Sequence, residues 1–277
     1  MLDAPASPLP LLALSAVAAL GVVALLAQPW WVRWRRERLR APPFPAAWRR
    51  ILRRRVPAVA RLPYDLQRRL KRHIQVFVAE KPFTGCQGQI ITDEVRVTIA
   101  AQACLLLLGH DQPDCYPRLT QILVYPEAFA TRREQPLGNG LVQEQRVAMS
   151  GESWSLGQVV LSWADVLAGA ADPADGHNVV LHEFAHQIDQ DNGIADGRPW
   201  RPTATLQRRW ATVMDGALTR LRSEPSSLID AYAATQPAEF FAVVTEVFFE
   251  RPRALANEAP DVYRELADLY GVDPRVW

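Results

Sequence analysis

The stretch GHNVVLHEFAHQIDQDNG, residues 176–193, decides how the rest of this chain is interpreted. His182 and His186 are four residues apart, so in a helix they lie on one face, where both imidazoles can bind one ion. Glu183 lies beside them. Zinc held by nitrogen ligands with one open position lowers the pKa of a bound water to about 7, and a neighbouring carboxylate can accept the proton. The pattern predicts a zinc site in which Glu183 activates water to hydrolyse an amide.

The positions that follow the motif limit the choice of a third zinc ligand. The extended pattern HExxHxxGxxH requires Gly and His where this chain has Asp189 and Asn192, and no histidine follows His186. A three-histidine site of that kind is therefore excluded. Asp189 lies on the same helical face as both histidines, and we expect it to be a partner that supports them from behind.

A carboxylate on a later helix is the best remaining candidate for the third ligand. The apolar stretch PAEFFAVVTEVFFE, residues 237–250, predicts a helix that begins at Pro237 and has Glu239 in its first turn. Glu239 is the candidate ligand, and Glu246 is the alternative. Both residues share one helical face, so the spacing alone is equally consistent with an exposed acidic stripe.

Outward from the motif, the chain predicts a helix-rich α+β fold with a small sheet over residues 61–277. Helical patterns cover residues 62–80 and 91–109, and Thr92 is the expected cap of the second helix. Short runs of branched and aromatic residues, 120–125 and 158–162, are typical of strands.

The charge distribution argues against a nucleic-acid-binding function. Residues 31–72 contain fifteen of the 31 Lys and Arg residues, whereas residues 73–277 contain sixteen basic and 27 acidic residues. Phosphate contacts need clustered basic residues at the binding face. We therefore expect no direct nucleic-acid binding by the acidic domain, and residues 32–60 are interpreted as a basic, Pro- and Arg-rich neck.

The N-terminal region predicts a membrane anchor. After a tail of residues 1–8, residues 9–31 are uncharged and apolar, which is the length of a transmembrane helix. Tryptophans and five arginines follow, as the positive-inside rule requires of a cytoplasmic flank. The expected location is the inner (cytoplasmic) membrane, single-pass, with the catalytic domain in the cytosol. The alternative is a cytoplasmic protein with an N-terminal extension.

Five segments together resemble the Mlc titration factor A type zinc peptidases, whose catalytic core is related to that of anthrax lethal factor. They are DEVRVTIAAQACLLLLG, ILVYP, GESWSLGQVVLSWADVLAG, DGHNVVLHEFAHQID and PAEFFAVVTEVFFE. The resemblance covers roughly residues 60–275 and implies a zincin-like metallopeptidase fold. It implies that His182, His186 and Glu239 bind Zn²⁺, that Glu183 is the general base, and that Tyr232 stabilises the oxyanion. From its sequence context alone, Tyr232 would be interpreted as a packing residue.

The resemblance also suggests what the protein binds. In lethal-factor-like enzymes a peptide lies beside an edge strand, and the stretch GQVVLSW, residues 157–163, would supply that strand. The family name points to a second reading, a regulator-binding protein that sequesters a transcriptional repressor with weak or no peptidase activity. The combination of base, ligands and oxyanion donor favours the peptidase.

Overall fold

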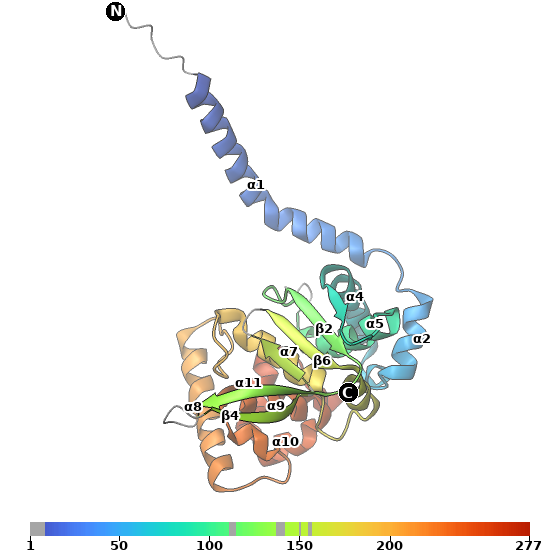
Figure 1. Ribbon diagram of the computed structural model, residues 1–277, viewed down its shortest axis with the longest axis vertical. Helices are drawn as coiled ribbons and strands as arrows, with labels where there is room; N and C mark the ends of the chain where they lie inside the picture. The colour runs from blue at the N-terminus through green and yellow to red at the C-terminus, as the bar shows by residue number, and fades with distance from the viewer. Residues whose placement is uncertain (1–8, 111–114, 137–141, 150, 155–156) are drawn as a thin grey trace, which may run out of the picture. The chain divides into compact units, whose positions relative to one another are not determined.

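The chain divides into two compact units, Met1–Pro43 and Phe44–Trp277. The computed structural model describes residues 9–110, 115–136, 142–149, 151–154 and 157–277 (Figure 1). Side chains are described for residues 18–110, 115–128 and 157–277.

The first unit contains one long helix, α1 (Leu9–Arg40). The predicted tail, residues 1–8, lies outside the described residues. No helix in the described part of the chain is long and apolar enough to span a membrane, so the predicted transmembrane helix over residues 9–31 is not supported.

The second unit is the predicted helix-rich α+β domain. Before the predicted metal-binding motif its helices are α2 (Ala46–Arg55), α3 (Ala58–Arg61), α4 (Tyr64–Glu80), α5 (Asp93–Ala103) and α6 (Trp163–Ala171). The motif helix and those after it are α7 (Val179–Asp189), α8 (Ala204–Ser223), α9 (Pro237–Glu250), α10 (Pro252–Glu258) and α11 (Pro260–Tyr270). The short 3₁₀ helices are η1 (Cys104–Leu107), η2 (Gln190–Asn192), η3 (Ala231–Ala234) and η4 (Pro274–Val276). As predicted, Thr92 caps α5 and accepts a hydrogen bond from the amide of Val95.

A four-stranded sheet has the order β1-β2-β6-β5. The strands are β1 (Phe83–Gly85), β2 (Gln121–Tyr125), β5 (Gly151–Trp154) and β6 (Gln158–Ser162). β1, β2 and β6 are parallel, and β5 is antiparallel to β6. A separate antiparallel pair consists of β3 (Phe129–Pro136) and β4 (Val142–Met149).

The prediction that β6 is an edge strand is wrong. β6 pairs with β2 on one side and with β5 on the other, so β5 occupies the edge. Four consecutive residues of β6, from Val159 to Ser162, are buried. A strand with such a continuous buried run belongs in the interior of a sheet.

The core positions the motif helix between the sheet and α9. α7 contacts β5 and β6 and packs against α9. The central region of Figure 1 shows α7 close to β6 and α9. Phe184 of α7 is fully buried and contacts the rings of Phe77 and Tyr116. Nearly every residue of α9 is buried, including Phe240, so its carboxylates cannot form the exposed stripe that the sequence also allowed. The packing fixes the two helices against each other.

Candidate metal centre

Asn178 starts the motif helix. Its side-chain oxygen accepts hydrogen bonds from the amides of Val180 and Leu181, both at 3.1 Å, and so caps α7. Its side-chain amide donates to Glu250 Oε1 at 3.0 Å, and its backbone amide donates to Glu246 Oε2. One buried asparagine therefore fixes the beginning of α7 against α9.

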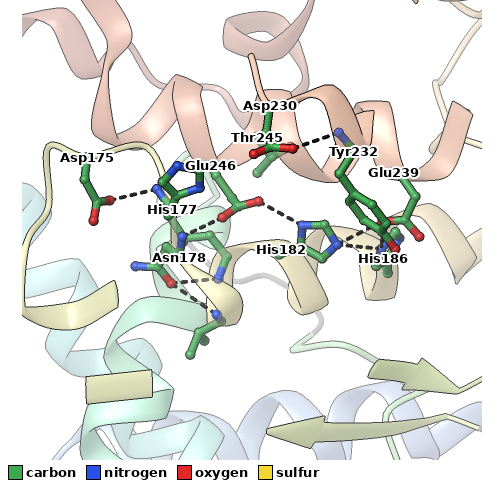
Figure 2. A network of polar contacts seen from close by, with 12 residues as sticks. Asp175, His177, Asn178, His182, His186, Asp230, Tyr232, Glu239, Thr245 and Glu246 are labelled. Atoms are coloured by element: carbon green, nitrogen blue, oxygen red, sulfur yellow. Dashed lines mark hydrogen bonds and ion pairs between the residues drawn. The ribbon is translucent and has the colours of Figure 1, made fainter. Parts of the chain in front are cut away.

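Three side-chain atoms that could act as metal ligands lie close together, as the right-hand part of Figure 2 shows. Nε2 of His182 lies 3.2 Å from Nε2 of His186 and 3.1 Å from Oε2 of Glu239. The third side of this triangle, from His186 Nε2 to Glu239 Oε2, is 3.5 Å. Ligands held tetrahedrally at about 2.0–2.1 Å from zinc lie about 3.3 Å from one another. The three residues therefore fit one small metal ion.

Glu246 lies on the other side of the His182 ring. Its Oε1 is 2.8 Å from Nδ1 of His182, which can donate its hydrogen to the carboxylate (Figure 2). A histidine that donates from one ring nitrogen presents the other as a lone pair to a metal. The arrangement thus places Glu239, and not the alternative Glu246, in the cluster that could hold a metal ion.

The carboxylates of Glu239 and Glu246 favour positive charge at the His182 side chain. Burial disfavours the charged imidazole, but hydrogen bonds to Glu239 and Glu246 outweigh it and raise the pKa of His182 to about 10. Burial would also raise the pKa of Glu239, yet its hydrogen bonds to His182 and His186 hold that pKa well below its usual range. A metal cation can supply the charge that these carboxylates stabilise.

The other two predicted reaction residues lie next to this cluster. Glu183 is on α7 between the two histidines and is only 3% exposed. Tyr232 lies in η3, where its amide donates to Asp230 Oδ1. Its ring centroid is 6.3 Å from that of His182, and 53% of the residue is exposed. Tyr232 is thus at the solvent side of the histidine pair and is not a core packing residue.

Asp189 is buried but has another bonding partner. Its Oδ2 accepts a hydrogen bond of 2.7 Å from the amide of Gly197. Burial raises the pKa of Asp189 to about 6 despite this bond. A Cβ on Gly197 would lie 2.4 Å from the carbonyl oxygen of Pro237, at the beginning of α9. Asp189 therefore anchors a loop against the helix that carries Glu239, and no hydrogen bond in the described structure joins it to His182 or His186.

The sequence did not reveal the roles of Asn178 and Glu246. His177, directly before Asn178, is exposed, and its amide donates to Asp175 Oδ1. Asn178 could have been identified as a cap from its residue type, directly before an apolar helical pattern. The position of Glu246, two helical turns after Glu239, gave no such signal because it depends on how α9 lies against α7.

Comparison with known proteins agrees with this site. The family model of the glucose-regulated metallo-peptidase M90 matches residues 31–271. A protein of Synechocystis sp., slr2042, is 38% identical over 263 residues, which cover 93% of this chain and 95% of the relative. Mlc titration factor A of Klebsiella pneumoniae (strain 342) is 35% identical over 228 residues, 79% of this chain and 84% of the relative. The protein of the same name from Cronobacter sakazakii is 33% identical over 240 residues, 83% of this chain and 87% of the relative.

These matches confirm the family expected from the sequence. The family description also agrees with a His, His and Glu cluster that can hold a metal ion. The chain belongs to the glucose-regulated metallo-peptidase M90 family, together with the Mlc titration factor A proteins.

Proposed function

We propose that this protein is a zinc-dependent peptidase in which His182, His186 and Glu239 hold the metal and Glu183 is the general base. The observation that carries the proposal is the triangle of donor atoms, with sides of 3.1, 3.2 and 3.5 Å. Nitrogen and carboxylate ligands of this kind suit zinc. When bound, zinc supplies a Lewis acid that lowers the pKa of water and polarises a carbonyl group.

The protein's own residues would then move protons and stabilise charge. Glu183 accepts a proton from the attacking water and passes it to the departing amine. The hydroxyl of Tyr232 donates a hydrogen bond to the carbonyl oxygen of the substrate as that oxygen becomes negative. Glu246 keeps the ring of His182 in the orientation that directs Nε2 towards the metal.

The peptide substrate would pair with β5. This strand lies at the edge of the four-stranded sheet and beside α7, so a peptide added there passes the metal centre. Main-chain hydrogen bonds supply much of the affinity in this mode of recognition, and side-chain preference then depends on nearby pockets.

The test compares the parent protein with Glu183→Gln for zinc content and for cleavage of a peptide library. We expect stoichiometric zinc in both proteins and cleavage only by the parent, since the substitution removes the base and keeps all three ligands. Asp215→Asn is the control, because it removes an exposed carboxylate on α8 that pairs with Arg198. If the parent binds zinc but cleaves no peptide, the peptidase proposal is wrong.

The name of the relatives supports a second function. Mlc titration factor A is named for an effect on Mlc. We propose that this chain also binds a transcriptional repressor of that kind. Binding that is equal in the parent and in Glu183→Gln would show that the interaction does not need the hydrolytic site, whereas binding to neither would contradict this second proposal.

A further inference from the structure

A cavity separate from the metal centre lies beside the beginning of α7. Its volume is about 540 Å³, and Asn178 and Leu181 form part of its wall. The rest of the wall comes from α3 and the residues on either side of it, from α5, η1 and α6, from the junction of α9 and α10, and from the C-terminal segment that includes η4. None of the three candidate metal ligands lines it. The volume is in the range of sites that bind small molecules.

Positive charge predominates in this cavity. Four arginines line it, and Glu250 is the only acidic side chain in its wall. Arg275 is neutralised by two hydrogen bonds to Asp273. Arg61 and Arg251 have no acidic partner among the described residues. Burial raises the pKa of Glu250 to about 8, which disfavours its negative charge, and both of its oxygens already accept hydrogen bonds from N–H groups of the protein. An anion would therefore be attracted to the cavity.

A buried acceptor in the same wall has no partner. Gln102 is 1% exposed, and its side-chain amide nitrogen donates to the carbonyls of Thr98, at 3.2 Å, and Val166, at 3.5 Å. These two bonds fix the orientation of the amide. The other atom, Oε1, has no hydrogen-bond partner in the described structure. Because buried polar atoms are normally paired, this oxygen indicates that a donor from a bound molecule belongs here.

The remaining lining is apolar. Leu62, Leu105, Leu181, Phe249 and Trp277 contribute side chains to the cavity. A mostly apolar wall with a few convergent polar groups is typical of a site for a small organic molecule.

We propose that this cavity binds a small organic anion that has a carboxylate or phosphate group, an apolar or aromatic body, and a hydroxyl or amine donor. The anionic group contacts Arg61 or Arg251, the body packs on the leucines, Phe249 and Trp277, and the donor bonds Gln102 Oε1.

Calorimetric titration of the full chain with matched probes tests the ligand chemistry. The probes are para-hydroxyphenylacetate, phenylacetate, phenyl phosphate and the neutral para-hydroxyphenethyl alcohol. We expect saturable binding of the anions and at least about tenfold weaker binding of the neutral alcohol, since hydrogen bonds to a charged group are the strong ones. Para-hydroxyphenylacetate should bind more tightly than phenylacetate because only the former has a donor for Gln102. The relative affinity of phenylacetate and phenyl phosphate identifies the preferred anionic group.

Arginine variants show whether the probes bind in this cavity. They are needed because the carboxylate of a probe could also bind to a metal ion at another place in the protein. Arg61→Gln or Arg251→Gln should weaken binding of the preferred anion by about tenfold and leave the neutral alcohol unaffected. Arg208→Gln removes an exposed arginine on α8 that does not line the cavity, and it should have no effect. Circular dichroism checks that each variant is folded. The proposal is overturned if none of the anions binds saturably, if the neutral alcohol binds as tightly as the anions, or if neither arginine variant weakens binding.

Discussion

At the scale of single residues, His182 is held from both sides. Glu246 contacts its Nδ1 at 2.8 Å, and Glu239 and His186 contact its Nε2. Glu246 is itself fixed by the backbone amide of Asn178. The orientation of the imidazole is therefore determined before a metal binds, which reduces the entropic cost of forming the site.

Glu246→Gln tests this positioning role. Replacing the carboxylate by a neutral amide weakens the bond to Nδ1 of His182, and we expect the affinity for zinc to fall by about 10- to 100-fold with the fold intact. Competition with a chelator of known affinity measures the change. Glu224→Gln, an exposed glutamate at the end of α8, is the control. An unchanged zinc affinity in Glu246→Gln would show that Glu246 does not orient the ligand.

Tyr232→Phe tests the proposed oxyanion donor. The substitution removes one hydroxyl from a residue that is half exposed, so stability and zinc content should not change. The value of kcat for peptide cleavage should fall by about 100-fold or more, with KM nearly unchanged, because the lost bond forms only in the transition state. Tyr64→Phe, on an exposed tyrosine of α4, is the control. Equal kcat values for both variants would assign Tyr232 a merely structural position.

At the scale of elements, the site consists of two helices in a fixed rotation against each other. The spacing of His182 and His186 follows from the period of one helix, so the sequence could predict it. The choice between Glu239 and Glu246 depends on which turn of α9 faces α7, and no local pattern contains that information. The exposure of Tyr232 likewise depends on where η3 lies against α9. Local rules therefore predicted the helices and the spacing of the histidine pair, whereas the choice of Glu239 as the third candidate ligand needed the family resemblance.

Asn178→Ala tests how strongly the start of α7 is tied to α9. Loss of a helix cap alone costs about 0.5–2 kcal/mol. Here the substitution also removes the hydrogen bond to buried Glu250, so we expect the free energy of unfolding to fall by about 2 kcal/mol or more. Thr203→Ala removes the cap of α8, which has no such second bond, and should cost about 1 kcal/mol. Urea denaturation measures both variants, and equal losses would mean that the Asn178–Glu250 bond adds no stability.

At the scale of the whole molecule, the unit Phe44–Trp277 includes residues that the sequence suggested were a basic neck. Residues 46–55 form α2, which packs against α5. Trp48 donates a hydrogen bond to Asp93, and two arginines of α2 pair with Glu94. Trp48, Ile51 and Leu52 follow the i, i+3, i+4 spacing of an amphipathic helix and are half-buried or buried, but the high arginine content of the segment hid this pattern.

Two truncations test whether α2 and α3 belong to the folded domain. Residues 44–277 should keep the free energy of unfolding and the zinc affinity of the full chain. Residues 62–277 lack Leu52, Val56 and Val59, which are all buried. Each such side chain contributes about 1.5–3 kcal/mol when it is removed from water, so the shorter fragment should lose about 5 kcal/mol or more. Because domains of this size are stable by only about 5–15 kcal/mol, we expect it to be largely unfolded or aggregated. Circular dichroism and thermal denaturation of the two fragments measure this difference. If residues 62–277 fold as stably as residues 44–277, the two basic helices are a linker after all, and the domain begins near residue 61 as the sequence suggested.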